Sequence, residues 1–266
     1  MKSEMKLGII VFSCDKYSDL WESFFYFFNK FWADCPYPIY LSTNSKPFEF
    51  KNVSPLYSNQ TSTWGQETIA SVSQYPYDYF IYFQEDYFLT KKVNNQEIAS
   101  LFNKMLNLNA QYLRLFPSPG ADQKTENEND FGIISIDAPY RTSTQCSIWK
   151  TDTFKSIIQP QESAWQFELN SPIRSKDFLF LSMFRKDSKN PIYPINYYYM
   201  TAVYKGKWLR KPLNDCIVEG LTIDLNYRKV ESNWDIFYRK TYHISPVFVR
   251  HLLDFSNKKI NKKQFI

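Results

Sequence analysis

The chain has few of the residues that build disulfide or zinc scaffolds. Its 266 residues include only two histidines and four cysteines, and no Cys-x-x-Cys spacing occurs among Cys14, Cys35, Cys146 and Cys216. This scarcity argues against a disulfide framework and against a His/Cys zinc site. We therefore expect a protein of the reducing cytoplasm.

Long apolar runs are also missing, because none approaches the roughly 20 residues of a membrane-spanning helix. The first residues, Met1 to Lys6, lead directly into a strand-like run, which argues against a signal peptide. No internal repeat is found.

The body of the chain also has no excess of positive charge. The net charge is +5, but residues 248–266 hold five Lys or Arg residues and one Asp, so the rest is close to neutral. We therefore expect no nucleic-acid partner. The tail mixes its bases with Leu252, Leu253 and Phe255, so contact with an anionic membrane surface and a plain solvated terminus both stay open.

Aromatic residues, in contrast, make up 19% of the chain, and the run from Tyr79 to Phe83 consists of aromatic and β-branched residues alone. A run without polar alternation is typical of a strand that is covered on both faces of an α/β sheet. Glu85 and Asp86 follow it directly. Carboxylates just past the carboxyl end of a central strand lie where open α/β sheets bind their ligands.

Strand-like and helix-like segments alternate along the chain, which predicts a mixed, mainly parallel central sheet flanked by helices. Asp19 and Glu22 have capping-box spacing, and residues 117–130 are expected to form a loop. We expect one α/β domain over 1–227 and a short, helical C-terminal extension over 228–266. The expected strands are 6–13, 39–44, 79–83, 112–116, 131–136 and 140–149, with 192–204 extended; the expected helices are 19–32, 64–75, 94–106, 152–158, 162–170, 177–185 and 212–220.

Several short motifs follow one another along the chain: Ser13-Cys-Asp15, Trp64 before a helix, Gln84-Glu-Asp86, Thr144-Gln-Cys-Ser-Ile-Trp-Lys150, Ser163-Ala-Trp-Gln-Phe-Glu168 and Lys205-Gly-Lys-Trp208. Their order resembles that of bacterial nucleotide-sugar glycosyltransferases of the GT-A fold, the type that builds capsules and lipopolysaccharide. The likeness covers about 6–227. The resemblance implies a GT-A-like, Rossmann-like sheet and Mn²⁺ or Mg²⁺ as the metal. It also implies transfer of a sugar from a nucleotide-sugar donor, a UDP-linked one before others, to a hydroxyl of a saccharide or lipid-linked saccharide.

The resemblance also implies roles for individual residues. Asp86, with Glu85 beside it, would bind the metal, although Gln84 stands where the family has the first acid of Asp-x-Asp. Glu168 would be the base of an inverting displacement. The remaining candidates are Trp165 and Gln145 for the acceptor, Ser13, Asp15, Thr43 and Asn44 for base and ribose, and Lys207, Arg210 and Lys211 for the diphosphate.

Each assignment has a plainer alternative. Glu85 and Asp86 would simply end a strand in solvent, and Glu168 would be an exposed acid on a helix. For Trp165 taken alone, a position in the core is the better interpretation. Two other functions also stay open. One is a metal-independent transferase that uses the basic turn at 207–211, and the other is a non-catalytic carbohydrate-binding protein. The oligomeric state is open, and the protein is expected in the cytoplasm, at the inner face of the membrane if the tail binds there.

Overall fold

The computed structural model describes residues 6–59, 63–125, 128–189 and 191–242. The chain divides into two compact units, Met1–Tyr199 and Met200–Ile266. The boundary expected after Tyr227 thus falls inside the second unit. The basic tail and its expected membrane contact lie outside the described residues.

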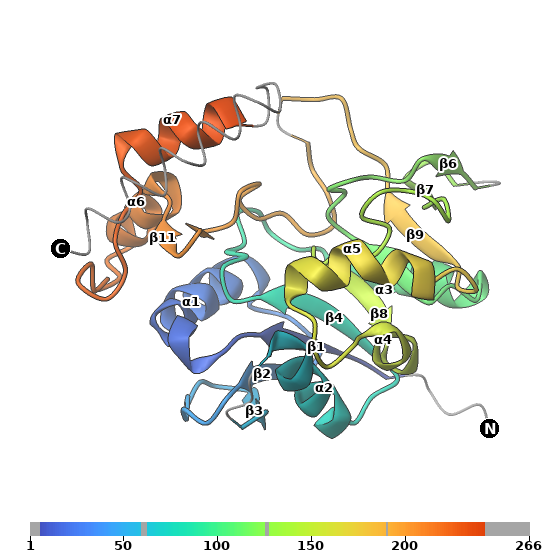
Figure 1. Cartoon of the computed structure of the whole chain (residues 1–266), viewed down its shortest axis with the longest axis horizontal. Coiled ribbons are helices and arrows are strands. Elements are labelled where there is room, and N and C mark those ends of the chain that lie inside the picture. The colour runs from blue at the N-terminus through green and yellow to red at the C-terminus, as the bar shows by residue number, and fades with distance from the viewer. Residues whose placement is uncertain (1–5, 60–62, 126–127, 190, 243–266) are drawn as a thin grey trace. The chain divides into compact units, whose positions relative to one another are not determined.

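The first unit is built on a nine-stranded sheet among the described residues, with the order β3-β2-β1-β4-β8-β5-β9-β7-β6 (Figure 1). The four strands from β3 to β4 are parallel, whereas β8 lies antiparallel between β4 and β5. The predicted class, a mixed and mainly parallel Rossmann-like sheet, is confirmed. The strands are β1 (Leu7–Phe12), β2 (Ile39–Thr43), β3 (Val53–Tyr57), β4 (Tyr79–Gln84), β5 (Tyr112–Arg114), β6 (Gln123–Lys124), β7 (Phe131–Ile133), β8 (Ser147–Lys150) and β9 (Phe180–Met183).

Helices cover both faces of this sheet, as the run from Tyr79 to Phe83 predicts. Successive residues of β4 point to opposite faces. Phe80 packs on Phe154 of α4, in a core that also includes residues of α2 and α5. Phe83 packs on Phe24 of α1, and Tyr79 packs on α3. The helices are α1 (Trp21–Trp32), α2 (Trp64–Gln74), α3 (Asn95–Asn107), α4 (Thr151–Ile157) and α5 (Ala164–Arg174).

Side-chain caps fix where three of these helices begin. Thr63 caps α2, Asn94 caps α3, and Ser163 with Gln166 forms a capping box at the start of α5. The capping box predicted at Asp19 is wrong. A 3₁₀ helix, η1 (Asp15–Leu20), runs directly into α1, and no side chain caps α1.

Three expected elements of the first unit differ in the structure. Residues 177–185, predicted to be helical, contain strand β9, which is buried between β5 and β7. The strand predicted over 140–149 starts only at Ser147. Strand β3 lies where no strand was predicted, and as an edge strand it tolerates Pro55 because an edge leaves one side of the backbone unpaired.

The second unit contains a hairpin and two helices. Lys205 and Gly206, with φ of 50° and 76°, turn the chain between β10 (Val203–Tyr204) and β11 (Lys207–Trp208). Helices α6 (Arg210–Val218) and α7 (Asn233–Tyr242) follow. Of these, α7 lies within the expected extension over 228–266, and residues 243–266 of that extension lie outside the described part of the chain. No helix in the described part of the chain has the length and apolarity needed to span a membrane.

Candidate functional site

The carboxyl ends of β1 and β4 form the point at which the strand order reverses. After β1 the chain adds β2 and β3 on one side, and then places β4 on the other side of β1. Doubly wound sheets bind ligands in the crevice at such a switch point. A cavity of about 250 Å³ lies there, lined by Phe12, Ser13, Cys14, Tyr17, Ser42, Trp64, Glu67, Thr68, Gln84, Glu85, Asp86 and Ala164. We call it the switch-point cavity.

The two predicted metal ligands both line this cavity. Glu85 is buried and Asp86 is half-buried. Among the described residues no group of three or more His, Cys, Asp or Glu side chains is arranged to hold a metal ion. One or two carboxylates together with phosphate oxygens nevertheless suit Mg²⁺ or Mn²⁺, which take oxygen ligands. The pair therefore fits a cation that a nucleotide would help to hold.

Cys14 also lines the cavity, but it is not a nucleophile at neutral pH. Burial raises the pKa of its thiol to about 11, and the negative charge of Glu85 adds to that rise. The thiol is therefore protonated, and only thiolates are strong nucleophiles.

Asp15, Thr43 and Asn44 are brought together, but they bind one another rather than line the cavity. The Asp15 carboxylate accepts hydrogen bonds from the Thr43 hydroxyl at 2.7 Å, from Ser45 Oγ at 2.9 Å and from three backbone amides. Burial by itself raises the pKa of Asp15, but hydrogen bonds from Thr43, Lys46 and Ser45 outweigh it and lower the pKa to about 2. This cluster ties the end of β1 to the loop after β2. Of the predicted base and ribose residues, only Ser13 reaches the cavity.

Two side chains at the start of α2 are functional candidates to which sequence reasoning assigned no role. Trp64 and Glu67 line the cavity, and Asn44 Nδ2 donates to Glu67 Oε1 at 2.7 Å. Burial raises the pKa of Glu67, the bond from Asn44 lowers it, and the charge of Asp15 raises it; the net shift is upward. The sequence feature that could have identified Glu67 is its position in the first turn of the helix that follows the second predicted strand.

Gly65 explains how α2 approaches the loop before α5. Its amide donates to the Glu162 carbonyl at 2.9 Å, and a Cβ atom there would lie 2.2 Å from the Gln159 carbonyl oxygen. Trp64 and Ala164, on either side of this contact, both line the cavity. Glu162 itself is buried and paired with Arg174 at 2.6 Å, so it does not replace Glu168 as a base.

Glu168 projects from α5 one turn after Ala164, on the same helix face. Its Oε1 accepts hydrogen bonds from Ser143 Oγ at 2.9 Å, from the Thr144 amide at 2.7 Å and from Thr144 Oγ1 at 2.8 Å. No described residue donates to Oε2. The carboxyl group is therefore held by one oxygen, and the other can accept a further bond.

The buried phenol of Tyr82 is affected by the charges of all three acids. Burial raises its pKa well above the usual value, and after a lowering contribution from Gln84 the charges of Glu168, Glu85 and Asp86 raise it further. All three carboxylates are thus close enough to the buried Tyr82 hydroxyl to act on it electrostatically.

The two predicted acceptor residues lie in different settings. Trp165 is 61% exposed and touches Tyr140 edge to face, so its interpretation as a core residue is wrong. Gln145 is half-buried, and its Oε1 accepts a hydrogen bond from the Tyr197 hydroxyl. Gln145 follows Thr144, the residue that holds Glu168.

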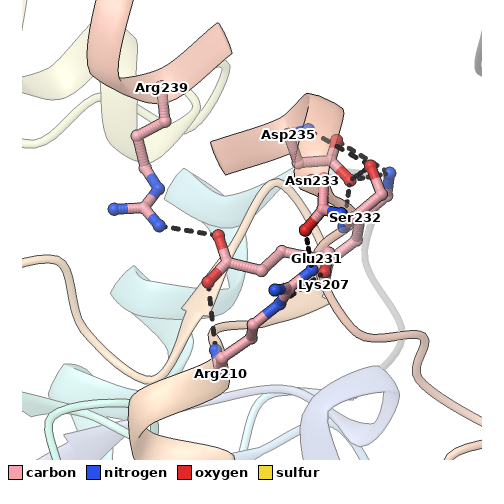
Figure 2. A network of polar contacts seen from close by, with 7 residues as sticks. All are labelled: Lys207, Arg210, Glu231, Ser232, Asn233, Asp235 and Arg239. Atoms are coloured by element: carbon pink, nitrogen blue, oxygen red, sulfur yellow. Dashed lines mark hydrogen bonds and ion pairs between the residues drawn. The ribbon is translucent and has the colours of Figure 1, made fainter. Parts of the chain in front are cut away.

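The predicted diphosphate residues belong to the second unit, where acidic and amide side chains already contact them. Figure 2 shows these contacts for Lys207 and Arg210. Lys207 Nζ pairs with Asp235 at 2.9 Å, and the Arg210 guanidinium donates to Asn233 Oδ1 at 2.7 Å. Lys211 pairs with Asp215 at 2.6 Å. Within this unit, carboxylates therefore already offset the charges of Lys207 and Lys211.

No protein-family profile and no curated protein sequence matches the chain. Among solved structures, it is similar to S. aureus TarS 1-349 at 12% identity and a TM-score of 0.46, over 69% of this chain and 59% of that one. It is similar to a UDP-glucose pyrophosphorylase complexed with UDP-glucose at 8% identity and a TM-score of 0.47, over 73% of this chain and 93% of that one. It is similar to M. tuberculosis glucosyl-3-phosphoglycerate synthase at 11% identity and a TM-score of 0.40, over 72% of this chain and 75% of that one. With TM-scores below 0.5, these similarities decide neither fold nor activity.

Proposed function

We propose that the protein is a glycosyltransferase that moves a sugar from a nucleotide-sugar donor to a hydroxyl of a saccharide or lipid-linked saccharide, with inversion. One observation carries the proposal. The switch-point cavity has Glu85 and Asp86 in its wall, and Glu168 stands one turn along the helix whose first residue also lines it. We place the reaction in surface polysaccharide synthesis, in the cytoplasm or at the inner face of its membrane.

The donor nucleotide would occupy the switch-point cavity. Trp64 and Tyr17 offer aromatic surfaces to a base, and Glu67, whose Oε1 is held by Asn44, offers its second oxygen to ribose hydroxyls. The diphosphate would then lie at the carboxyl ends of β1 and β4, beside Glu85 and Asp86. A UDP-linked sugar is the first donor to test.

Asp86, with Glu85, would hold Mg²⁺ or Mn²⁺ together with the diphosphate oxygens. When bound, the cation offsets the negative charge that builds up on the departing nucleoside diphosphate. The basic turn at 207–211 is the alternative source of positive charge, but Asp235 and Asp215 already pair with two of its lysines. We therefore favour the metal-assisted form.

Glu168 would act as the base. As the acceptor oxygen forms its bond to the anomeric carbon, its proton passes to Glu168 Oε2, and the bond from that carbon to the diphosphate oxygen breaks. The three hydrogen bonds to Oε1 keep the carboxyl group oriented during this step. Trp165, exposed on the same helix, and Gln145 would contact the acceptor sugar.

Thermal unfolding in the presence of UDP, GDP or dTDP, with CMP in parallel and with and without Mn²⁺, tests the proposal. A ligand that binds only the folded state raises the unfolding temperature. We expect one diphosphate to give a metal-dependent shift that D86N removes, and the matching nucleotide sugar to be slowly hydrolysed. A shift unchanged in EDTA would support the metal-independent alternative. No response to any nucleotide would support a non-catalytic binding protein.

A further inference from the structure

A second cavity, of about 670 Å³, lies in the first unit beyond the ends of β4, β5 and β9. We call it the basic cavity. None of its lining residues belongs to the switch-point cavity, and the proposed chemistry uses none of them. They are Thr90, Lys91, Phe116, Pro117, Arg185, Lys186, Asp187, Ser188, Lys189, Pro191, Tyr193, Asn196, Tyr197 and Tyr199.

Buried aromatic side chains form one wall of the basic cavity. Phe116, Tyr193 and Tyr197 are each less than 10% exposed, and the Phe116 ring lies 4.3 Å from that of Tyr197. Tyr197 also stacks on Tyr87 with a centroid separation of 4.4 Å. These contacts hold the rings in place. A fixed aromatic wall suits the apolar C–H face of a sugar ring.

Cations surround this wall. Lys91, Arg185, Lys186 and Lys189 line the cavity, against a single carboxylate, Asp187. The ammonium groups of Lys91 and Lys186 donate to backbone carbonyls at 3.2 and 3.0 Å, and Lys186 also interacts electrostatically with Glu97. In the described residues none of the four is ion-paired with a carboxylate. A concave surface with this charge attracts anions, and an arginine fork binds phosphate or carboxylate in bidentate geometry.

The basic cavity is connected to the loop that holds Glu168. The Tyr197 hydroxyl accepts a hydrogen bond from the Cys146 amide at 3.3 Å and donates to Gln145 Oε1. Thr144, one residue earlier, donates two hydrogen bonds to Glu168. A ligand on the aromatic wall would therefore lie beside the segment that orients the proposed base.

We propose that the basic cavity binds an anionic saccharide, one that carries a phosphate or carboxylate group, with the anion on Arg185 and Lys189 and the sugar ring on the aromatic wall. In a glycosyltransferase this saccharide would be a further, anionic part of the acceptor, beyond the sugar that Trp165 and Gln145 contact, and that role rests on the function proposed above. The binding itself does not depend on that function, so the two can be tested separately.

The test measures binding of glucose 6-phosphate, glucuronic acid and glucose to the full chain by ligand-observed NMR at low salt. We expect at least one anionic sugar to bind at least tenfold more tightly than glucose, and the stronger of the two identifies phosphate or carboxylate as the group recognised. R185Q/K189Q should weaken that binding at least tenfold. The matched control K155Q/K176Q removes two exposed positive charges elsewhere on the first unit and should leave it unchanged.

The inference would be overturned if all three sugars bind with equal affinity or if the anionic sugars do not bind. It would also be overturned if both double variants lose the same amount of affinity. The nucleotide response in thermal unfolding separates it from the proposed function, because R185Q/K189Q leaves the switch-point cavity intact. Charge-selective sugar binding without any nucleotide response would refute the transferase but keep the anion site. The reverse pattern would refute the anion site alone.

Discussion

Replacing Glu168 separates its structural contribution from its proposed catalytic one. E168A removes the acceptor of three hydrogen bonds from Ser143 and Thr144. E168Q keeps an oxygen that can accept the same three bonds, but it removes the negative charge and cannot take up a proton. The two variants should therefore differ in stability and agree in activity.

The structure sets the size of each effect. A hydrogen bond to a charged group contributes about 1.5–3 kcal/mol when buried, but Glu168 is half-buried and solvent replaces part of what is lost. We expect E168A to lower the free energy of unfolding by about 2–3 kcal/mol, and E168Q by about 1 kcal/mol. Loss of a general base should slow transfer by about 10²–10⁴-fold in both.

Urea unfolding measures the first quantity, and hydrolysis of the nucleotide sugar identified by the thermal screen measures the second. E49Q, which removes an exposed carboxylate from the loop between β2 and β3, is the matched control and should change neither. If E168Q hydrolyses the donor at the wild-type rate, Glu168 is not the base. If E168A is as stable as the wild type, the three hydrogen bonds do not support the loop.

Three further predictions concern residues around the site. G65A should lower the free energy of unfolding by about 1–3 kcal/mol and reduce the nucleotide-induced thermal shift, since the added Cβ would collide with the Gln159 carbonyl. Asp15 should stabilise the fold fully above its unfolded pKa near 3.8 and lose this contribution as the pH falls towards about 2; urea unfolding across that range should show a smaller pH dependence in D15N. R141K should cost about 3 kcal/mol in urea unfolding, because the buried Arg141 guanidinium donates to the carbonyls of Ser135, Ser175 and Phe178, and a lysine cannot reach all of them; an unchanged midpoint would contradict this.

The helices and strands that local chemistry specifies were predictable. The uninterrupted apolar run of β4 predicts a strand covered on both faces, and Asn94 with Glu97 indicates the start of α3. Residues 177–185 were mistaken for a helix because a short apolar segment has no decisive period. Only pairing with β5 and β7 makes it strand β9.

The loop at 141–146 shows how tertiary contacts override a local preference. Its β-branched threonines favour a strand, yet the Thr144 amide donates to Glu168 rather than to a neighbouring strand. Arg114 and Arg141, both buried, bind backbone carbonyls of the segments around this loop. A buried arginine whose hydrogen bonds go to backbone carbonyls carries no signal in the sequence, because arginine is usually exposed.

The sequence by itself determined the α/β class and placed Ser13, Glu85 and Asp86 at the ends of strands, because strand periodicity and strand ends are local properties. The tertiary structure decided which distant residues meet. It locked Asp15, Thr43 and Asn44 into one cluster, brought Trp64 and Glu67 into the cavity, and gathered Lys91 and Arg185 around another. Such tertiary contacts depend on strand order and helix packing, which no short stretch of sequence encodes.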